Sequence, residues 1–318
     1  MRLVTFASRG RTRVGALSGG WIVDLTAAAQ AHYAARGAAR PGARARTLLP
    51  PSMRHLLAGG DEALTFARAV TAEAEARLST TEGARALEAD GIAWRRDDVR
   101  LLPPVPAPPK ILCVGRNYAE HAREGGSDPP ELPIFFGRFP HSLLGPGEPY
   151  VMPRASTQVD FEGELAAIIG TGGRDIPEAR ALRHVAGYTP FNDMSIRDYQ
   201  RRTSQWMLGK NFDRSGPLGP ALVTRDEIPD PQALTLTVDV SGERMQEVST
   251  SIMIFTVAYL IAYVSRVLTL EPGDVIATGT PSGVGYARTP PRWLRPGDVV
   301  RVEITGLGAL ETPVAAGS

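Results

Sequence analysis

The 318-residue chain has little cysteine and no long apolar stretch. Its single cysteine, Cys113, cannot form a disulfide within the chain, and its apolar neighbours favour a small buried side chain over a nucleophile. The longest apolar run, Ile252–Val264, is shorter than the roughly 20 residues that span a bilayer. It follows Ser249–Ser251, residues that cap helices, so we expect a buried helix there.

Net charge is nearly absent, with a formal value of +1 at pH 7 and no long block of one sign. The electrostatics therefore support neither a nucleic acid nor a membrane as partner. The N-terminus lacks the basic and apolar segments of a secretory signal, so we expect a cytoplasmic protein. Only Lys110 and Lys210 are lysines, which makes each notable, whereas the arginine-rich segment 36–46 is typical of a solvated loop.

The order of patterns along the chain predicts an α+β protein. Residues 1–102, strand-like and then rich in alanine, fit a small N-terminal α/β domain, and the proline-rich segment 103–109 fits an extended linker. Residues 110–318 lack strict βαβ alternation, so we expect a mixed or largely antiparallel sheet. The expected strands there are Ile111–Val114, Leu165–Ile169, Leu234–Val240, Val275–Thr278 and Val299–Ile304. Pro272-Gly273 and Pro296-Gly297 suit type II turns at strand starts.

Acidic residues occupy every second position of the sequence VDFEGELAAIIG: Asp160, Glu162 and Glu164. In a strand this period places all three carboxylates on one face. With a third carboxylate from elsewhere, neighbouring acids can hold a hard cation such as Mg²⁺, Mn²⁺ or Ca²⁺, which prefers oxygen ligands. An edge strand with one face in water explains the pattern equally well when it is taken alone.

Other segments carry polar residues in suggestive places. His121 and Glu124 have the spacing at which two helical side chains meet, and a carboxylate orients an imidazole for proton transfer. A surface His–Glu pair accounts for that spacing as well. Lys210 lies in a loop rich in glycine and proline. Because the sequence lacks the phosphate-loop and Gly-x-Ser-x-Gly motifs, nucleotide binding and serine hydrolase chemistry are not expected.

Taken together and in order, six segments resemble the fumarylacetoacetate hydrolase family. They are GRNYAEHARE, DFEGELAAIIG, GYTPFNDMSIRDYQ, LGKNFDRSGPLGP, PGDVIATGTPSGVG and LRPGDVVRVEITGLG. The resemblance covers about residues 110–314 and implies a mixed β-roll catalytic domain, usually dimeric, with a role in the catabolism of aromatic compounds. The first hundred residues look like the smaller domain that many bacterial members carry.

The resemblance also assigns the site. It implies that Glu162, Glu164 and Asp193 hold Mg²⁺ or Mn²⁺, or Ca²⁺, and that Asp160 lies behind these ligands or in solvent. His121 and Glu124 match a water-activating dyad, and Lys210 is expected to stabilise negative charge. The substrate-contacting positions are Arg197, Gln200 and Thr280. Arg138 departs from a lysine that many relatives have nearby, so it is left out of the expected site.

These residues predict hydrolysis of a carbon–carbon bond in an acylpyruvate-like 1,3-diketo acid. The cation would chelate the 2-oxo acid end, and His121 would activate water for attack on the distal carbonyl. The metal and Lys210 would stabilise the enolate that is released. Decarboxylation of a 2-oxo acid, isomerisation of a hydroxydienoate and dehydration of a sugar acid remain alternatives, as does a non-catalytic or biosynthetic relative. We expect a small-molecule substrate and a homodimer.

Overall fold

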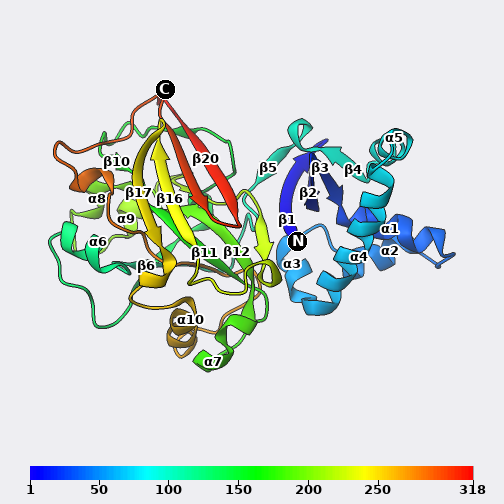
Figure 1. Cartoon of the computed structure of the whole chain (residues 1–318), viewed down its shortest axis with the longest axis horizontal. Coiled ribbons are helices and arrows are strands. Elements are labelled where there is room, and N and C mark those ends of the chain that lie inside the picture. The colour runs from blue at the N-terminus through cyan, green and yellow to red at the C-terminus, as the bar shows by residue number, and fades with distance from the viewer. Residues whose placement is uncertain (318) are drawn as a thin grey trace.

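The computed structural model describes residues 1–317, and Figure 1 shows an N-terminal part beside a larger remainder. The strands of the N-terminal part are β1 (Arg2–Ser8), β2 (Arg11–Ser18), β3 (Trp21–Asp24), β4 (Ala93–Arg95) and β5 (Arg100–Leu102). Its helices are α1 (Leu25–Ala35), α2 (Pro41–Leu48), α3 (Met53–Ala58), α4 (Gly60–Leu78) and α5 (Thr81–Ala89). Arg9 and Gly10, both with positive φ, join β1 to β2 in a two-residue turn whose twist suits a hairpin.

The remainder holds fifteen more strands within the described chain. They are β6 (Ile111–Gly115), β7 (Ile134–Arg138), β8 (Leu143–Leu144), β9 (Tyr150–Val151), β10 (Val159–Asp160), β11 (Gly163–Ile169), β12 (Val185–Asn192), β13 (Ser195–Ile196), β14 (Gly216–Pro217), β15 (Leu222–Thr224), β16 (Thr235–Val240), β17 (Glu243–Ser249), β18 (Val275–Ala277), β19 (Val299–Ile304) and β20 (Gly308–Ala315). The helices are short: α6 (Ala119–Glu124), α7 (Glu178–Ala181), α8 (Arg197–Gln200), α9 (Met207–Lys210) and α10 (Val257–Ser265).

Two sheets organise the molecule. Over residues 1–317, an 11-stranded sheet runs in the order β4-β3-β2-β1-β15-β12-β11-β18-β6-β7, with β5 also paired to β1. A 5-stranded sheet runs β17-β16-β19-β20-β9. Most pairings are antiparallel, with parallel exceptions such as β6 with β18. Mixed sheets with separate helices confirm the predicted α+β class, while the β-roll description stays a prediction.

The two sheets pack closely at the strand that carries the acidic residues. Gly163 opens β11, and a Cβ atom there would lie 2.2 Å from Cγ2 of Val238 on β16. Glycine is therefore the residue that lets the sheets approach. The side chains of Val238, Leu236 and Val302 form part of a large apolar core on this side of β11.

The predicted strands agree with the structure to within two residues, and both Pro-Gly turns are confirmed. Gly273 and Gly297 have φ values of +89° and +94°, as the third position of a type II turn requires. The segment 103–109 contains no helix or strand. Because β1 pairs with β15, however, one sheet extends across the predicted boundary, and the division into separate domains stays a prediction.

Two local predictions need correction: the expected buried helix is present but begins later, and the arginine-rich segment is not a loop. The helix expected from Ile252 begins at Val257, because Asn117 binds the backbone of Ile254 and Phe255 and holds that segment out of the helix. The arginine-rich segment expected to be a loop is helical over Pro41–Leu48, although its arginines are exposed as predicted. Among the described helices, none combines the length and apolar character that crossing a membrane requires. The cytoplasmic location stays a prediction.

Candidate metal centre and active site

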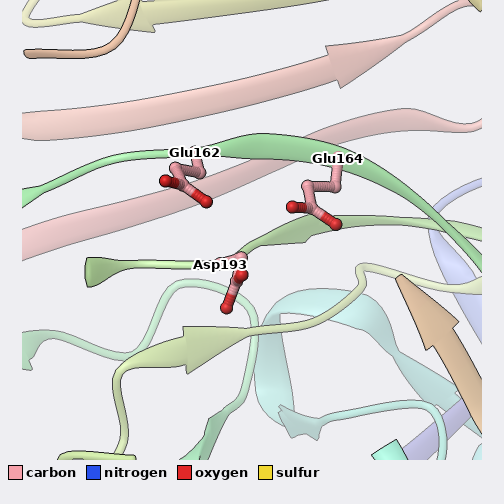
Figure 2. Close-up of side chains that lie close together, drawn as sticks. All are labelled: Glu162, Glu164 and Asp193. Carbon is pink, nitrogen blue, oxygen red and sulfur yellow. The ribbon is translucent and has the colours of Figure 1, made fainter. Parts of the chain in front are cut away.

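The three carboxylates expected to hold a metal ion come together where β11 begins. Glu162 immediately precedes β11 and Glu164 is its second residue, and both are buried. Asp193 directly follows β12, the antiparallel neighbour of β11. Each of the three residues offers a carboxylate oxygen, and these oxygens lie within 4.8 Å of one another. Figure 2 shows the three side chains close together, with Asp193 on the side of β11 toward which Glu162 and Glu164 extend.

Asn192 and Asp193 hold the backbone of Glu162 in place. The side-chain oxygen of Asn192 accepts a hydrogen bond from the amide of Glu162 at 3.0 Å. The amide of Asp193 in turn donates to the carbonyl of Glu162 at 2.9 Å. These bonds hold two chain segments in register at the point where their carboxylates converge, so the motif positions Glu162 as well as supplying Asp193.

Three buried basic side chains partly neutralise this cluster. The Lys210 ammonium lies 2.7 Å from Glu162 and 2.6 Å from Asp193, and it also contacts the Asp193 carbonyl. Arg197 lies 2.7 Å from Glu162, and Arg138 donates to Asp193 at 2.5 Å. Burial would lower the pKa of Lys210, but the carboxylates of Asp193 and Glu162 raise it, so the ammonium stays charged.

The two glutamates differ in their electrostatic surroundings. Burial would raise the pKa of Glu162, but Lys210, Arg197 and His121 lower it to about 2. Burial raises the pKa of Glu164 well above its usual range, and the charges of Asp193 and Glu162 raise it further. Glu164 accepts a hydrogen bond from the Gly279 amide, but within residues 1–317 it has no basic partner closer than 4 Å. A cation would relieve this repulsion.

The donor set fits a hard divalent cation. All three ligands offer oxygen, they are buried, and their backbone is held by the bonds described above. Mg²⁺ and Mn²⁺ prefer such ligands, whereas softer metals prefer the nitrogen and sulfur that are missing from this group of three.

Asp160 lies behind the ligands and not in solvent. Its side chain is fully buried and pairs with Arg197 at 2.8 Å. It also accepts hydrogen bonds from the amides of Gly285 and Tyr286. The alternative that Asp160 lies in solvent was therefore wrong. The alternative of an edge strand with one face in water was also wrong, because Asp160, Glu162 and Glu164 are all buried. The physical reason is that Arg197 and two backbone amides replace the water that Asp160 loses.

The His–Glu dyad is formed and faces the carboxylates. Both residues lie on α6, and Nδ1 of His121 is 2.8 Å from Oε1 of Glu124. The other oxygen of Glu124 accepts from the amide of Gly283 at 2.9 Å, which fixes its orientation. His121 is largely buried and lines the same cavity as the three acids.

That cavity has a volume of about 220 Å³ and is lined by all of the expected substrate-contacting residues. Arg197, Gln200, Lys210 and Thr280 all line it. Gln200 accepts from Arg197 at 2.9 Å, and Thr280 accepts from Gln246 at 2.9 Å. The contacts of Lys210 with Glu162 and Asp193 show that it positions the ligands, and its expected part in stabilising substrate charge stays a prediction.

Five residues near the site were not part of the site expected from the sequence. Arg138 is buried against Asp193, while Arg116, Arg201, Trp206 and Tyr286 line the cavity. Arg116 is part of the motif GRNYAEHARE, which also holds the dyad, and Arg201 follows Gln200, so the position in the sequence was the available signal for those two. Arg138 lies 55 positions from its partner Asp193, and no local pattern connects them.

The chain is similar to known proteins over most of its length. The family profile "Fumarylacetoacetate (FAA) hydrolase C-terminal" matches residues 110–315. A mitochondrial oxaloacetate tautomerase of Xenopus laevis is 43% identical over 268 residues, covering 84% of this chain and 79% of the relative.

Two solved structures are similar as well. A 2-hydroxyhepta-2,4-diene-1,7-dioate isomerase of Mycobacterium marinum superposes with a TM-score of 0.70 at 31% identity, covering 99% of this chain and 98% of the other. A fumarylpyruvate hydrolase of Pseudomonas aeruginosa, solved with Mn²⁺ and pyruvate, has a TM-score of 0.61 at 36% identity, covering 68% of this chain and 92% of the other.

Proposed function

This chain belongs to the fumarylacetoacetate hydrolase family, and from that premise we propose that it is a divalent-cation-dependent enzyme acting on 2-oxo dicarboxylates. The reaction we favour is keto–enol tautomerisation of an oxaloacetate-like compound. The relative named for that reaction matches 84% of the chain at 43% identity, which supports the choice.

The main support for the proposal is that one cavity is lined both by a side chain that can accept a proton and by three carboxylates. His121, Glu162, Glu164 and Asp193 all line it. Tautomerisation requires only that a proton leave a carbon next to a carbonyl and return to oxygen, and one positioned base is enough for that. When bound at the triad, Mg²⁺ or Mn²⁺ would act as a Lewis acid toward the oxo and carboxylate oxygens of the substrate.

The chain's own residues then divide the remaining tasks. Because Nδ1 of His121 is bonded to Glu124, its Nε2 atom is the one available to take the proton from carbon. Glu124, held by the Gly283 amide, keeps the imidazole oriented. Arg197 and Gln200 present polar groups to the substrate at the buried end of the cavity, and Thr280 adds a hydroxyl.

Hydrolysis of an acylpyruvate is the second candidate, with fumarylpyruvate as the model substrate. The similarity to a fumarylpyruvate hydrolase supports it, because the same dyad can take a proton from water. Isomerisation of a hydroxydienoate uses the same proton transfer and is supported by the similarity to an isomerase. For decarboxylation and sugar-acid dehydration, the described residues offer no separate support. We keep the homodimer as part of the proposal, to be tested by light scattering in solution.

The test uses chelator-treated protein to which Mg²⁺ or Mn²⁺ is returned. Enol formation from oxaloacetate is followed by ultraviolet absorbance and by exchange of its C3 protons with deuterium, and pyruvate release from fumarylpyruvate is followed in parallel. We expect cation-dependent C3 exchange, and His121→Ala should lower it by about 10²- to 10⁴-fold, the usual contribution of a positioned base. His55→Ala, on the surface of α3, serves as the matched control.

Three results would change the assignment. Pyruvate release without accelerated exchange would move it to the hydrolase. Exchange that survives in His121→Ala would remove His121 from the proton transfer, while activity that is indifferent to chelation would overturn the cation requirement.

A further inference from the structure

Two arginines line the cavity without a partner for their charge. Arg116 follows β6, and Arg201 follows α8. Throughout residues 1–317, neither guanidinium group makes a hydrogen bond or an ion pair with the protein. The other basic residues that line the cavity, Arg197 and Lys210, are both paired with buried carboxylates.

The charges buried in the site show why two unpaired arginines at the cavity are unusual. Four buried carboxylates, those of Asp160, Glu162, Glu164 and Asp193, face three buried cations, those of Arg138, Arg197 and Lys210. A divalent cation at the triad would leave this buried group with one net positive charge, which matches the single carboxylate of a 2-oxo acid group. Arg116 and Arg201 then add two positive charges that no residue in 1–317 pairs with.

Both arginines are held by aromatic rings, which leaves their N–H groups free. The Arg201 guanidinium carbon lies 4.1 Å from the ring centroid of Tyr286, and that of Arg116 lies 5.4 Å from Trp206. Stacking of this kind orients a guanidinium group without using its donors. Tyr286 is itself anchored, because its amide donates to Asp160.

The backbone conformation at Gly115 and Arg116 also helps to position the Arg116 side chain. Arg116 has a φ of +58°, a left-handed conformation that is costly for a residue other than glycine. The preceding Gly115 lies against Trp206, since a Cβ atom there would come within 2.3 Å of the indole ring. The glycine thus allows Trp206 to lie close to the strand, where it supports Arg116.

We propose that Arg116 and Arg201 bind the distal carboxylate of a dicarboxylate substrate and thereby select diacids over monoacids. The inference rests on the proposed function, in which the 2-oxo acid end is bound at the triad. Arg201 is exposed and Arg116 half-buried, so the two lie where the cavity meets the solvent. A carboxylate there would receive charge-assisted hydrogen bonds from guanidinium forks, which suit its geometry.

The chain offers a matched control for Arg201. Arg202 is the next residue and also stacks on a tyrosine, Tyr199, at 3.7 Å. It differs in being paired with Asp198 at 3.6 Å and in lying outside the residues that line the cavity. Removal of its charge therefore tests the general effect of losing an arginine from this exposed segment.

The experiment compares oxaloacetate with its 4-ethyl ester, which keeps the 2-oxo acid end but lacks the distal charge. With Mn²⁺-loaded protein, Arg116→Gln and Arg201→Gln should each lower kcat/KM for oxaloacetate by about 10- to 100-fold, mainly through KM, as expected for loss of a hydrogen bond to a charged group. The kcat/KM for the ester should change little, and Arg202→Gln should affect neither compound. Binding of oxalate, measured by calorimetry, should be unchanged in all three variants.

Equal losses with oxaloacetate and the ester, or no loss with either, would overturn the proposed role while leaving the proposed function intact. If the wild-type protein releases pyruvate from fumarylpyruvate instead, the same comparison is made between fumarylpyruvate and the monoacid acetylpyruvate. If the wild-type protein transforms none of these compounds, the proposed function fails and this inference falls with it.

Discussion

The two parts of the molecule bury very different side chains. The N-terminal part packs α1 to α5 around its strands with alanine, leucine and valine, and Asp24 is its one buried charged residue within the described chain. The remainder buries seven charged side chains around a single cavity: Arg138, Asp160, Glu162, Glu164, Asp193, Arg197 and Lys210. The first arrangement stabilises by removing apolar surface from water, whereas the second is costly to bury and depends on each charge having a partner.

In the apolar core, a mutation can lower stability without changing the chemistry, whereas in the charged site it affects both. An apolar core tolerates a lost methyl group at a limited cost and has no direct effect on chemistry. A network of buried charges couples fold and function, because the residues that hold the ligands also neutralise them. Three predictions follow from this contrast and test it from the site outward.

Glu164→Gln should have the largest effect on catalysis. Loss of a charged ligand should reduce Mn²⁺ binding and turnover by at least about 10³-fold, because a Lewis acid contributes several kcal/mol. The metal-free protein should be no less stable than the wild type, since the change removes a buried charge that has no basic partner. Calorimetric titration with Mn²⁺ and thermal unfolding in chelator measure the two effects. If Glu164→Gln clearly destabilises the metal-free protein, then other protein groups already stabilise the negative charge of Glu164 without a cation.

Arg138→Met should destabilise the metal-free protein by about 3–5 kcal/mol, the usual cost of breaking a buried pair. It deprives the Asp193 carboxylate of one cation and leaves the hydroxyls of Ser142 and Ser215 without their donor. Denaturant unfolding of this variant is compared with that of Arg68→Met, which breaks the surface pair with Asp226 and should cost about 0–1 kcal/mol. Similar losses in the two variants would mean that burial does not strengthen the Arg138 pair.

Leu56→Ala should lower the free energy of unfolding by about 2–5 kcal/mol, as expected for a fully buried leucine. Leu56 lies on α3 in an apolar core that the N-terminal part shares with β6, β11, β12 and β18. The folded variant should keep its Mn²⁺ affinity and kcat/KM, because no charged residue of the site depends on this side chain. A weaker Mn²⁺ affinity at a temperature where the variant is folded would show that the two parts of the molecule are coupled.

Patterns within a few neighbouring residues were sufficient to predict part of the site. Alternation of acids placed Glu162 and Glu164 together, and the spacing of His121 and Glu124 predicted a contact that the structure has at 2.8 Å. The Pro-Gly turns were predictable for the same reason, since a type II turn needs only glycine at one position. The resemblance of ordered motifs added Asp193 to the two glutamates.

Contacts between distant segments were not predictable in this way. Helix α10 begins later than its capping residues indicated, because Asn117, 138 positions before Phe255, binds the intervening backbone. The sequence left Asp160 either behind the ligands or in solvent, and the structure shows that Arg197 and the amide of Gly285, 125 positions away, enclose it. A buried polar group takes whichever partners the fold brings near, and sequence spacing does not reveal them.

The sequence by itself therefore determined the class of fold, the family, the acidic pair and the dyad, because each depends on local periodicity or on motifs in order. The folded chain alone revealed which charges are paired: Lys210 and Arg138 contact the carboxylates of the triad, while Arg116 and Arg201 have no ion-pair partner among residues 1–317. The physical reason is that a Coulomb interaction depends on distance and burial in space, and the folded chain alone determines both.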